Sequence, residues 1–271
     1  AASDDEKLFR YLFLAQCREL ATCLPDVFEP VGAAMVLLLP EGLLRRGSVV
    51  QRLVDDIPDE DWREGVEIVG WMYQYYVSER KREVFDGYQE GKKAERDDIA
   101  AATQTFTPEW IVGYMVENTL GRTWMLNHSD SKLVDRMSFY VEPMGDIEKH
   151  PEAKTPETIT FCDPCCGSGH VLARAFDLLV FMYEEVGYTK RDAVRLIIEN
   201  NLYGFEIDKR ARALASFELV MKACEYDSRF LKRGVTPQIV YLAPVEFSAD
   251  EVTQLPELVD RKGLMNALAH L

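Results

Sequence analysis

Residues 158–242 alternate between short β-prone runs and longer amphipathic stretches, and this alternation restricts the fold more than any other feature of the chain. The β-prone runs are 158–162, 202–207 and 237–242. Between them, apolar residues recur at helical spacing, and Thr189 and Asp208 stand in helix-capping positions. Strands joined by helices of this length pair in parallel. The segment therefore predicts an α/β fold, with a parallel sheet flanked by helices on both faces.

The first hundred residues predict a separate, all-helical region. Asp61 and Glu64 form a capping box ahead of a long helix. An apolar stripe at the 3.6-residue period follows, formed by Trp62, Val66, Val69, Tyr73 and Tyr76. The stripe predicts a buried seam, with an aromatic ligand platform as the alternative. The charged stretch 79–98 predicts a solvent-exposed link, and we divide the chain into residues 1–100 and residues 101–271.

The segment most informative about chemistry is F-C-D-P-C-C-G-S-G-H, residues 161–170, at the first strand-to-helix turn. Gly167 and Gly169 permit close approach to a ligand, and the helix start beyond them offers unpaired N–H groups. Two nucleotide motifs do not fit, because Leu172 replaces the third glycine of G-x-G-x-x-G and no G-K-[ST] follows. Asp163 would repel a polyphosphate but would pair with a ligand ammonium, such as that of S-adenosylmethionine.

A second element, Y-G-F-E-I-D at residues 203–208, ends the next predicted strand. Glu206 is placed to accept hydrogen bonds from two ribose hydroxyls, and Ile207 to cover one face of an adenine. Simpler interpretations are a surface carboxylate at Glu206 and a turn-stabilising carboxylate at Asp163. Two such elements in order on consecutive strands favour a nucleoside-containing cofactor.

The cysteines around the glycine turn raise two other interpretations, a zinc site and a cysteine nucleophile. The candidate zinc ligands are Cys162, Cys165, Cys166 and His170. We expect no metal, because Cys162 should point into the sheet and the glycine turn has a better explanation. We expect no covalent step at Cys165, because no base is identifiable beside it.

Three motifs resemble the amino-terminal cofactor motifs of adenine-specific DNA methyltransferases: F-T-P at 106–108, D-P-C-C-G-S-G at 163–169 and Y-G-F-E-I-D at 203–208. Longer segments, 101–124 and 166–172, are similar to those of the large methyltransferases of bacterial BREX phage-defence systems and of related restriction-modification enzymes. The resemblance covers roughly residues 60–225. It implies a helical amino-terminal region followed by a Rossmann-like core that binds S-adenosylmethionine.

The resemblance also implies roles for individual residues. Phe106, Thr107 and Pro108 would lie beside the methionine part of the cofactor. Glu206 would hold the ribose, and Ile207 would touch the adenine. The cofactor turn would consist of Asp163, Pro164, Cys165, Gly167, Ser168 and Gly169.

One motif of the family is missing from this sequence. The family grips the flipped target base with Asn/Asp-Pro-Pro-Tyr/Phe, whereas the twelve prolines here include no Pro-Pro pair. The segment Y-L-A-P at 241–244 also replaces the acidic residue that meets the cofactor adenine in the family, and Glu246 is a weak substitute. We therefore expect the cofactor-binding part of an adenine-N6 DNA methyltransferase, truncated before its catalytic loop, with no catalytic residue and no activity alone.

The charge balance restricts the partners. The chain has 31 Lys and Arg against 46 Asp and Glu, a net charge of −15, and both regions carry more acid than base. We therefore expect double-stranded DNA to bind through regions outside this chain, with other defence-system proteins as further candidate partners. Two alternatives stay open: a methyltransferase acting on RNA, protein or a small molecule, and a non-catalytic, cofactor-binding defence scaffold. No apolar run approaches ~20 residues and no signal-peptide pattern occurs, so we expect an intracellular protein without membrane contact. The resemblance implies that its compartment is the bacterial cytoplasm.

Overall fold

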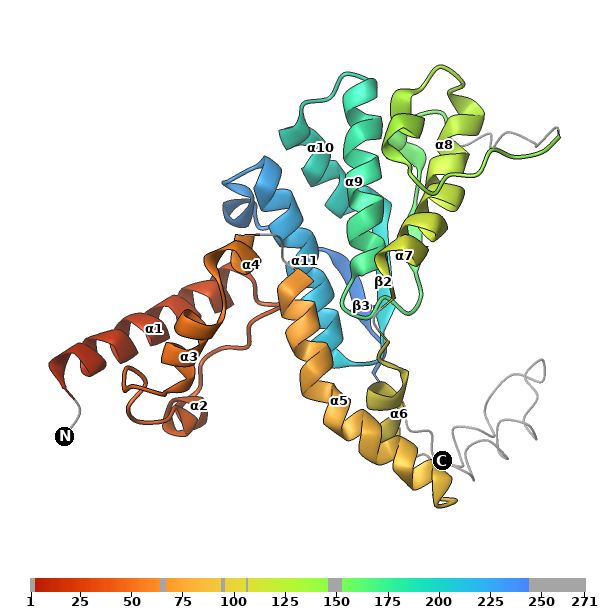
Figure 1. Cartoon of the computed structure of the whole chain (residues 1–271). Coiled ribbons are helices and arrows are strands. Elements are labelled where there is room, and N and C mark those ends of the chain that lie inside the picture. The colour runs from red at the N-terminus through yellow and green to blue at the C-terminus, as the bar shows by residue number, and fades with distance from the viewer. Residues whose placement is uncertain (1–2, 64–66, 94–95, 106, 146–152, 244–271) are drawn as a thin grey trace, which may run out of the picture.

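A computed structural model describes residues 3–63, 67–93, 96–105, 107–145 and 153–243 (Figure 1). The helices of residues 1–105 are α1 Asp4–Cys23, α2 Ala33–Leu38, α3 Val49–Asp56, α4 Asp59–Arg63, α5 Glu67–Gln89 and α6 Arg96–Thr103. The later helices are α7 Glu109–Val116, α8 Arg122–Asn127, α9 His170–Glu185, α10 Lys190–Leu196 and α11 Lys209–Tyr226. The strands are β1 Phe161–Asp163, β2 Leu202–Glu206 and β3 Gln238–Tyr241. None of these described helices is both long and apolar enough to cross a bilayer.

The three strands form one parallel sheet in the order β1-β2-β3. Their register places Cys162 beside Tyr203, and Tyr203 beside Gln238. The connection from β1 to β2 contains α9 and α10, and the connection from β2 to β3 contains α11. The predicted α/β fold with a parallel sheet is confirmed.

The helices cover one face of this sheet within the described residues, so the prediction of helices on both faces is wrong for this part of the chain. Leu202, Gly204 and Ile239 lie on the covered face, and a Cβ at Gly204 would meet Leu172 of α9. On the opposite face Gln238 and Val240 are exposed. Figure 1 shows α9 and α11 on the same side of the strands.

Helix α9 is the centre of the hydrophobic core. Leu172, Phe176, Leu179 and Tyr183, which share one face of this helix, are all fully buried. Burying one such side chain contributes about 1.5–3 kcal/mol. The helix ends before Gly187, whose φ of 95° is in the left-handed region that favours glycine.

The caps expected ahead of two helices are present. Thr189 Oγ1 accepts a hydrogen bond from Asp192 N–H at 3.2 Å and begins α10. Asp208 Oδ1 accepts from Arg210 N–H at 2.8 Å and begins α11. These bonds are local in sequence, which is why the residue types alone predict them.

The helical region differs from expectation in three places. Asp61, expected to cap a long helix, lies within the short helix α4, and its expected partner Glu64 lies outside the described residues. Helix α5 continues to Gln89 and α6 begins at Arg96, so the expected link over residues 79–98 is largely helical. The stripe on α5 is not a buried seam at its end, because Tyr76 is 66% exposed while Val77 beside it is buried. Val66 and the side chain of Trp62 lie outside the described residues.

Candidate functional site

The turn from β1 to α9 contains two glycines with left-handed φ angles, 55° at Gly167 and 101° at Gly169. A Cβ on Gly169 would lie 2.9 Å from the Cα of Ala215, so this glycine allows α9 to pack closely on α11. A Cβ on Gly167 would meet nothing nearer than Gln104 Oε1, at 3.9 Å. Space is therefore left beside Gly167, and Gln104, just before F-T-P, lies next to it.

Glu206, at the end of β2, is hydrogen-bonded to this turn. Its carboxylate is buried, and Oε2 accepts a hydrogen bond from Gly167 N–H at 2.7 Å. Oε1 accepts from Ile207 N–H at 2.9 Å and from Asp208 N–H at 2.8 Å. The side chain thus has a structural role that the sequence did not predict. An ionised carboxylate accepts about four hydrogen bonds, so Oε2 keeps capacity for a further donor.

Asp163 ends β1 with a half-buried carboxylate. Its Oδ1 accepts a hydrogen bond from Cys165 N–H at 3.0 Å, the turn-stabilising contact expected of an Asp here. Burial raises the pKa of Asp163, and the Cys165 N–H only partly opposes this change. A carboxylate that loses hydration without gaining a cation is suited to pair with a cationic ligand group.

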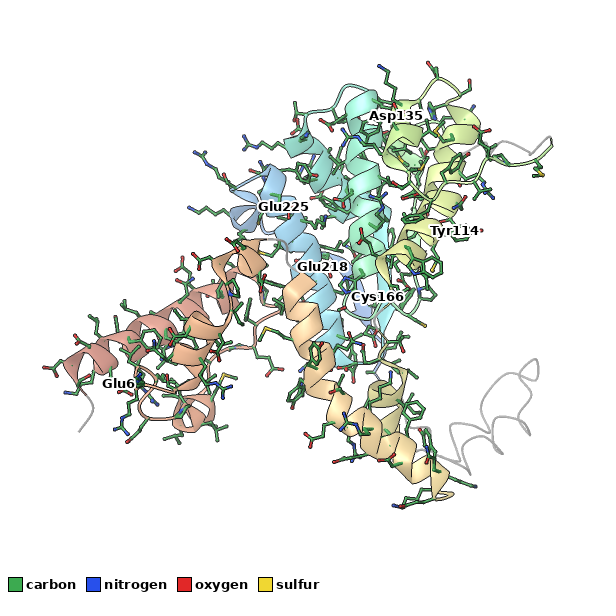
Figure 2. The ribbon with its side chains drawn as sticks, in the orientation of Figure 1. Glu6, Tyr114, Asp135, Cys166, Glu218 and Glu225 are labelled. Atoms are coloured by element: carbon green, nitrogen blue, oxygen red, sulfur yellow. The ribbon has the colours of Figure 1, made fainter. Side chains whose placement is uncertain are left out.

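The cysteines of the turn point to different environments. Cys166 lies in the interior near the start of α9 (Figure 2), and burial raises the pKa of its thiol to about 12. Cys165 is exposed, and so is Cys162, which corrects the expectation that Cys162 points into the sheet interior. Within the described residues no group of three potential ligands could hold a metal ion.

Two cavities lie close to this turn in sequence, and of the predicted site residues they include only Thr107, Pro108 and Ile207. A cavity of about 1270 Å³ is lined by Ile207 beyond β2 and by residues of α5, α6 and α11. A second cavity, of about 580 Å³, is lined by Thr107, Pro108 and His170. Phe106 lies outside the described residues. Thr107 and Pro108 are therefore on a different cavity from Ile207, and neither cavity is lined by residues 163–169 or by Glu206.

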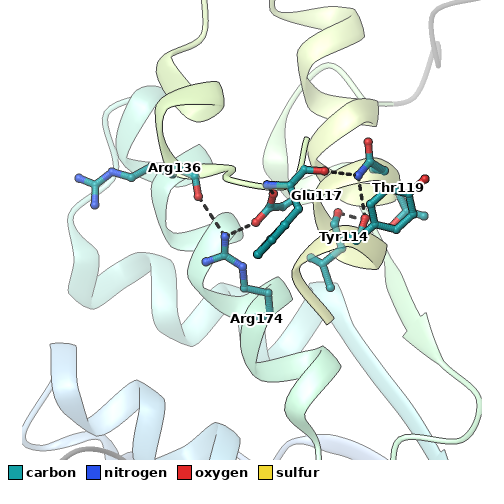
Figure 3. Close-up of polar contacts among 8 residues, drawn as sticks. Tyr114, Glu117, Thr119, Arg136 and Arg174 are labelled. Carbon is teal, nitrogen blue, oxygen red and sulfur yellow. Dashed lines mark hydrogen bonds and ion pairs between the residues drawn. The ribbon is translucent and has the colours of Figure 1, made fainter. Parts of the chain in front are cut away.

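The smaller cavity has a charged wall that the sequence did not predict (Figure 3). Glu117, only 1% exposed, lies in a π-helical turn, Glu117–Gly121, between α7 and α8. Its carboxylate accepts from Arg174 at 2.6 Å and from Phe139 N–H at 2.6 Å, and Arg174 also donates to Arg136 O at 3.0 Å. Single π-helical turns are frequent at functional sites, but no sequence pattern marks this one.

The larger cavity has an aromatic wall on α5. The Tyr73 hydroxyl donates a hydrogen bond to Asp208 Oδ2, and burial together with this bond raises the pKa of Tyr73. The rings of Tyr73 and Tyr76 stack with centroids 6.3 Å apart. Arg210 donates to the Tyr76 hydroxyl at 3.2 Å, and its guanidinium lies 5.5 Å from the ring centroid. The helical stripe in the sequence was the signal for these residues, and the exposure of Tyr76 does not fit the predicted buried seam.

Comparison with known proteins finds relatives of this chain, although no family model matches the sequence. The chain is 44% identical over 263 residues, 93% of its length, to the adenine-specific methyltransferase BrxX of Escherichia coli O9:H4 (strain HS). It is 38% identical over 254 residues, 88% of its length, to the adenine-specific methyltransferase PglX of Lacticaseibacillus casei (strain Zhang). Half of the chain is 27% identical to a putative type II restriction enzyme and methyltransferase of Methanocaldococcus jannaschii. The chain spans 21% of the length of BrxX and of PglX. By its sequence, the chain is similar to the adenine-specific methyltransferases BrxX and PglX over about nine-tenths of its own length.

Proposed function

We propose that this chain is the cofactor-binding part of an adenine-N6 DNA methyltransferase of a BREX or restriction-modification system, and that its cofactor is S-adenosylmethionine. The observation that carries the proposal is the open turn at Gly167, which Glu206 holds beside the half-buried Asp163. In this proposal residues 1–100 form a helical region and residues 101–271 the first half of a Rossmann-like core.

The order of the strands supports a Rossmann-like core. A parallel β1-β2-β3 arrangement is one half of the doubly wound order 3-2-1-4-5-6. In such sheets ligands bind beyond the carboxyl ends of the strands. Asp163 is the last residue of β1 and Glu206 the last residue of β2, so both lie at that edge.

The residues present fit the parts of this cofactor. The Asp163 carboxylate would pair with its ammonium, and the space beside Gly167 would admit its backbone-like amino-acid end. The free capacity of Glu206 Oε2 would accept a ribose hydroxyl, and Ile207, 44% exposed, would cover the adenine. Pro164, Cys165, Ser168 and Gly169 would shape the turn, with Phe106, Thr107 and Pro108 near the methionine part.

The chemistry divides between this chain and the rest of the enzyme. When bound, the cofactor supplies a methyl group activated by its positively charged sulfur. This chain orients that group, whereas the sequence lacks the Pro-Pro loop that would hold a flipped adenine. We infer that DNA contact and base placement use other parts of the enzyme, in the bacterial cytoplasm, and that the chain alone transfers no methyl group.

Calorimetric titration with S-adenosylmethionine tests the proposal. We expect binding by the parent chain, and at least about tenfold weaker binding by Gly167→Ala, because the added methyl group fills the space beside the turn. Gly187→Ala is the matched control, since Gly187 also has a left-handed φ, of 95°, but an added Cβ there would have no atom within 4 Å, and Gly187 has no place in the site. A folded parent that fails to bind, or equal affinities for the parent and Gly167→Ala, would contradict the proposal.

A further inference from the structure

The larger cavity, of about 1270 Å³, is lined by Ile207, one residue beyond Glu206, and by none of the turn residues 163–169. Ile207 and Asp208 line it from the end of β2, and Tyr241 lines it from the end of β3. Tyr76 of α5 lines the same cavity from the helical region. A cavity at the carboxyl edge of a parallel sheet is the usual place for a ligand, and its volume exceeds that of a typical small-molecule site.

We propose that helix α5 forms the outer wall of the adenosine end of the cofactor site, and that the adenine stacks on Tyr76. The helical region then takes part in cofactor binding instead of serving only as a support for the core. This inference rests on the proposed function, because it takes S-adenosylmethionine to be the ligand of the neighbouring turn.

Tyr76 has the properties of a binding platform. Tyr76 is 66% exposed and lines the cavity, so the residue is open to a ligand there. The ring is nevertheless held in place by the Arg210 hydrogen bond at 3.2 Å and by stacking on Tyr73 at 6.3 Å. A ring fixed before the ligand arrives loses little conformational freedom on binding. Base stacking on such rings is favourable for any base, because every base has a π-face.

The helical region is attached to the core at this cavity by several contacts. The Tyr73 hydroxyl donates to Asp208, which also caps α11. Arg212 donates to Asp26 O at 2.8 Å and to Asp26 Oδ1 at 3.0 Å. Figure 1 shows α5 lying along the start of α11, where these contacts occur. The aromatic wall is therefore part of the same packed unit as the end of β2.

The test uses two ligands that share an adenosine. S-adenosylmethionine carries an amino-acid group, whereas 5′-methylthioadenosine lacks it. We expect Tyr76→Ala to weaken the binding of both ligands by about five- to a hundredfold, the range expected for loss of one stacked base. Asp163→Ala should weaken only S-adenosylmethionine, because its carboxylate faces the ammonium. Tyr76→Phe keeps the ring and should stay within about threefold of the parent.

Tyr75→Ala is the matched control, because Tyr75 is 76% exposed on the same helix but does not line the cavity. Parent-like binding of both ligands by Tyr76→Ala, together with loss of S-adenosylmethionine binding by Asp163→Ala, would overturn this inference and leave the proposed function standing. No binding of either ligand by a folded parent would overturn both. An equal loss in Tyr75→Ala and Tyr76→Ala would assign the effect to the helix and overturn the role of the Tyr76 ring.

Discussion

Substituting Gly169 by alanine should destabilise the fold through two separate effects. The φ of 101° at this residue is unfavourable for a side chain, at about 1–2 kcal/mol. The new methyl carbon would also lie 2.9 Å from the Cα of Ala215, where ordinary contacts are 3.4–4 Å. Because this neighbouring atom belongs to the backbone, α9 and α11 must move apart, and such overpacking costs about 1–3 kcal/mol. The expected loss in unfolding free energy is about 2–5 kcal/mol.

Gly187→Ala separates the two effects, because Gly187 has a similar φ of 95° but no atom within 4 Å of the added carbon. It should lose only the conformational part, about 1–2 kcal/mol. Urea unfolding followed by circular dichroism measures both variants, with the midpoints compared at an unchanged m-value. Equal destabilisation of the two variants would refute the argument that contact with Ala215 requires a glycine at position 169.

Three further outcomes follow from charges and thiols. Burial raises the pKa of Asp163 above its ordinary 3.8, so the folded state keeps this proton at pH values where the unfolded chain has lost it. The unfolding free energy therefore falls as the pH rises from the unfolded pKa through the folded pKa. Asp163→Asn should therefore be more stable than the parent at pH 7 in denaturant titrations, and lower stability would contradict this. Arg174→Met leaves the buried Glu117 carboxylate without its cation and should lower the unfolding free energy by about 2–3 kcal/mol. This loss is at or below the range for fully buried pairs, because the Arg174 side chain is 30% exposed. Adding Glu117→Gln should restore part of that loss, and strictly additive losses would mean that the two side chains are not coupled. In folded protein at pH 8, iodoacetamide should label the exposed Cys165 and not Cys166, because burial raises the pKa of the Cys166 thiol to about 12. Peptide mass spectrometry measures the labelling, and equal labelling of the two cysteines would show that Cys166 is accessible.

The parts of the fold that could be predicted from sequence depend on contacts between near neighbours. The Asp208 cap bonds residues two and three positions ahead, and the Asp163 turn bonds a residue two positions ahead. Residue type decides such contacts, because the groups meet whenever the local backbone forms. The same holds for the apolar face of α9, whose 3.6-residue period marks the side that is buried.

The parts that could not be predicted depend on contacts between distant segments. Arg174 and Glu117 are 57 residues apart, and Tyr73 and Asp208 are 135 apart. A helical stripe says which side of α5 meets a neighbour, but not that Tyr76 faces a cavity instead of a core. In the same way, β-propensity does not show which face of the sheet the connecting helices leave uncovered.

The uncovered sheet face affects how the chain behaves in concentrated solution. Within the described residues, this face presents the apolar side chain of Val240 together with exposed Cys162. Exposed apolar surface of this kind favours self-association, while the net charge of −15 makes copies of the chain repel one another. Salt screens that repulsion, because the Debye length falls from about 10 Å at 0.1 M ionic strength to about 3 Å at 1 M. It does not weaken apolar contact. The colloidal stability of the chain should therefore decline as ionic strength rises, and a reducing agent should limit the cross-linking of associated copies through Cys162.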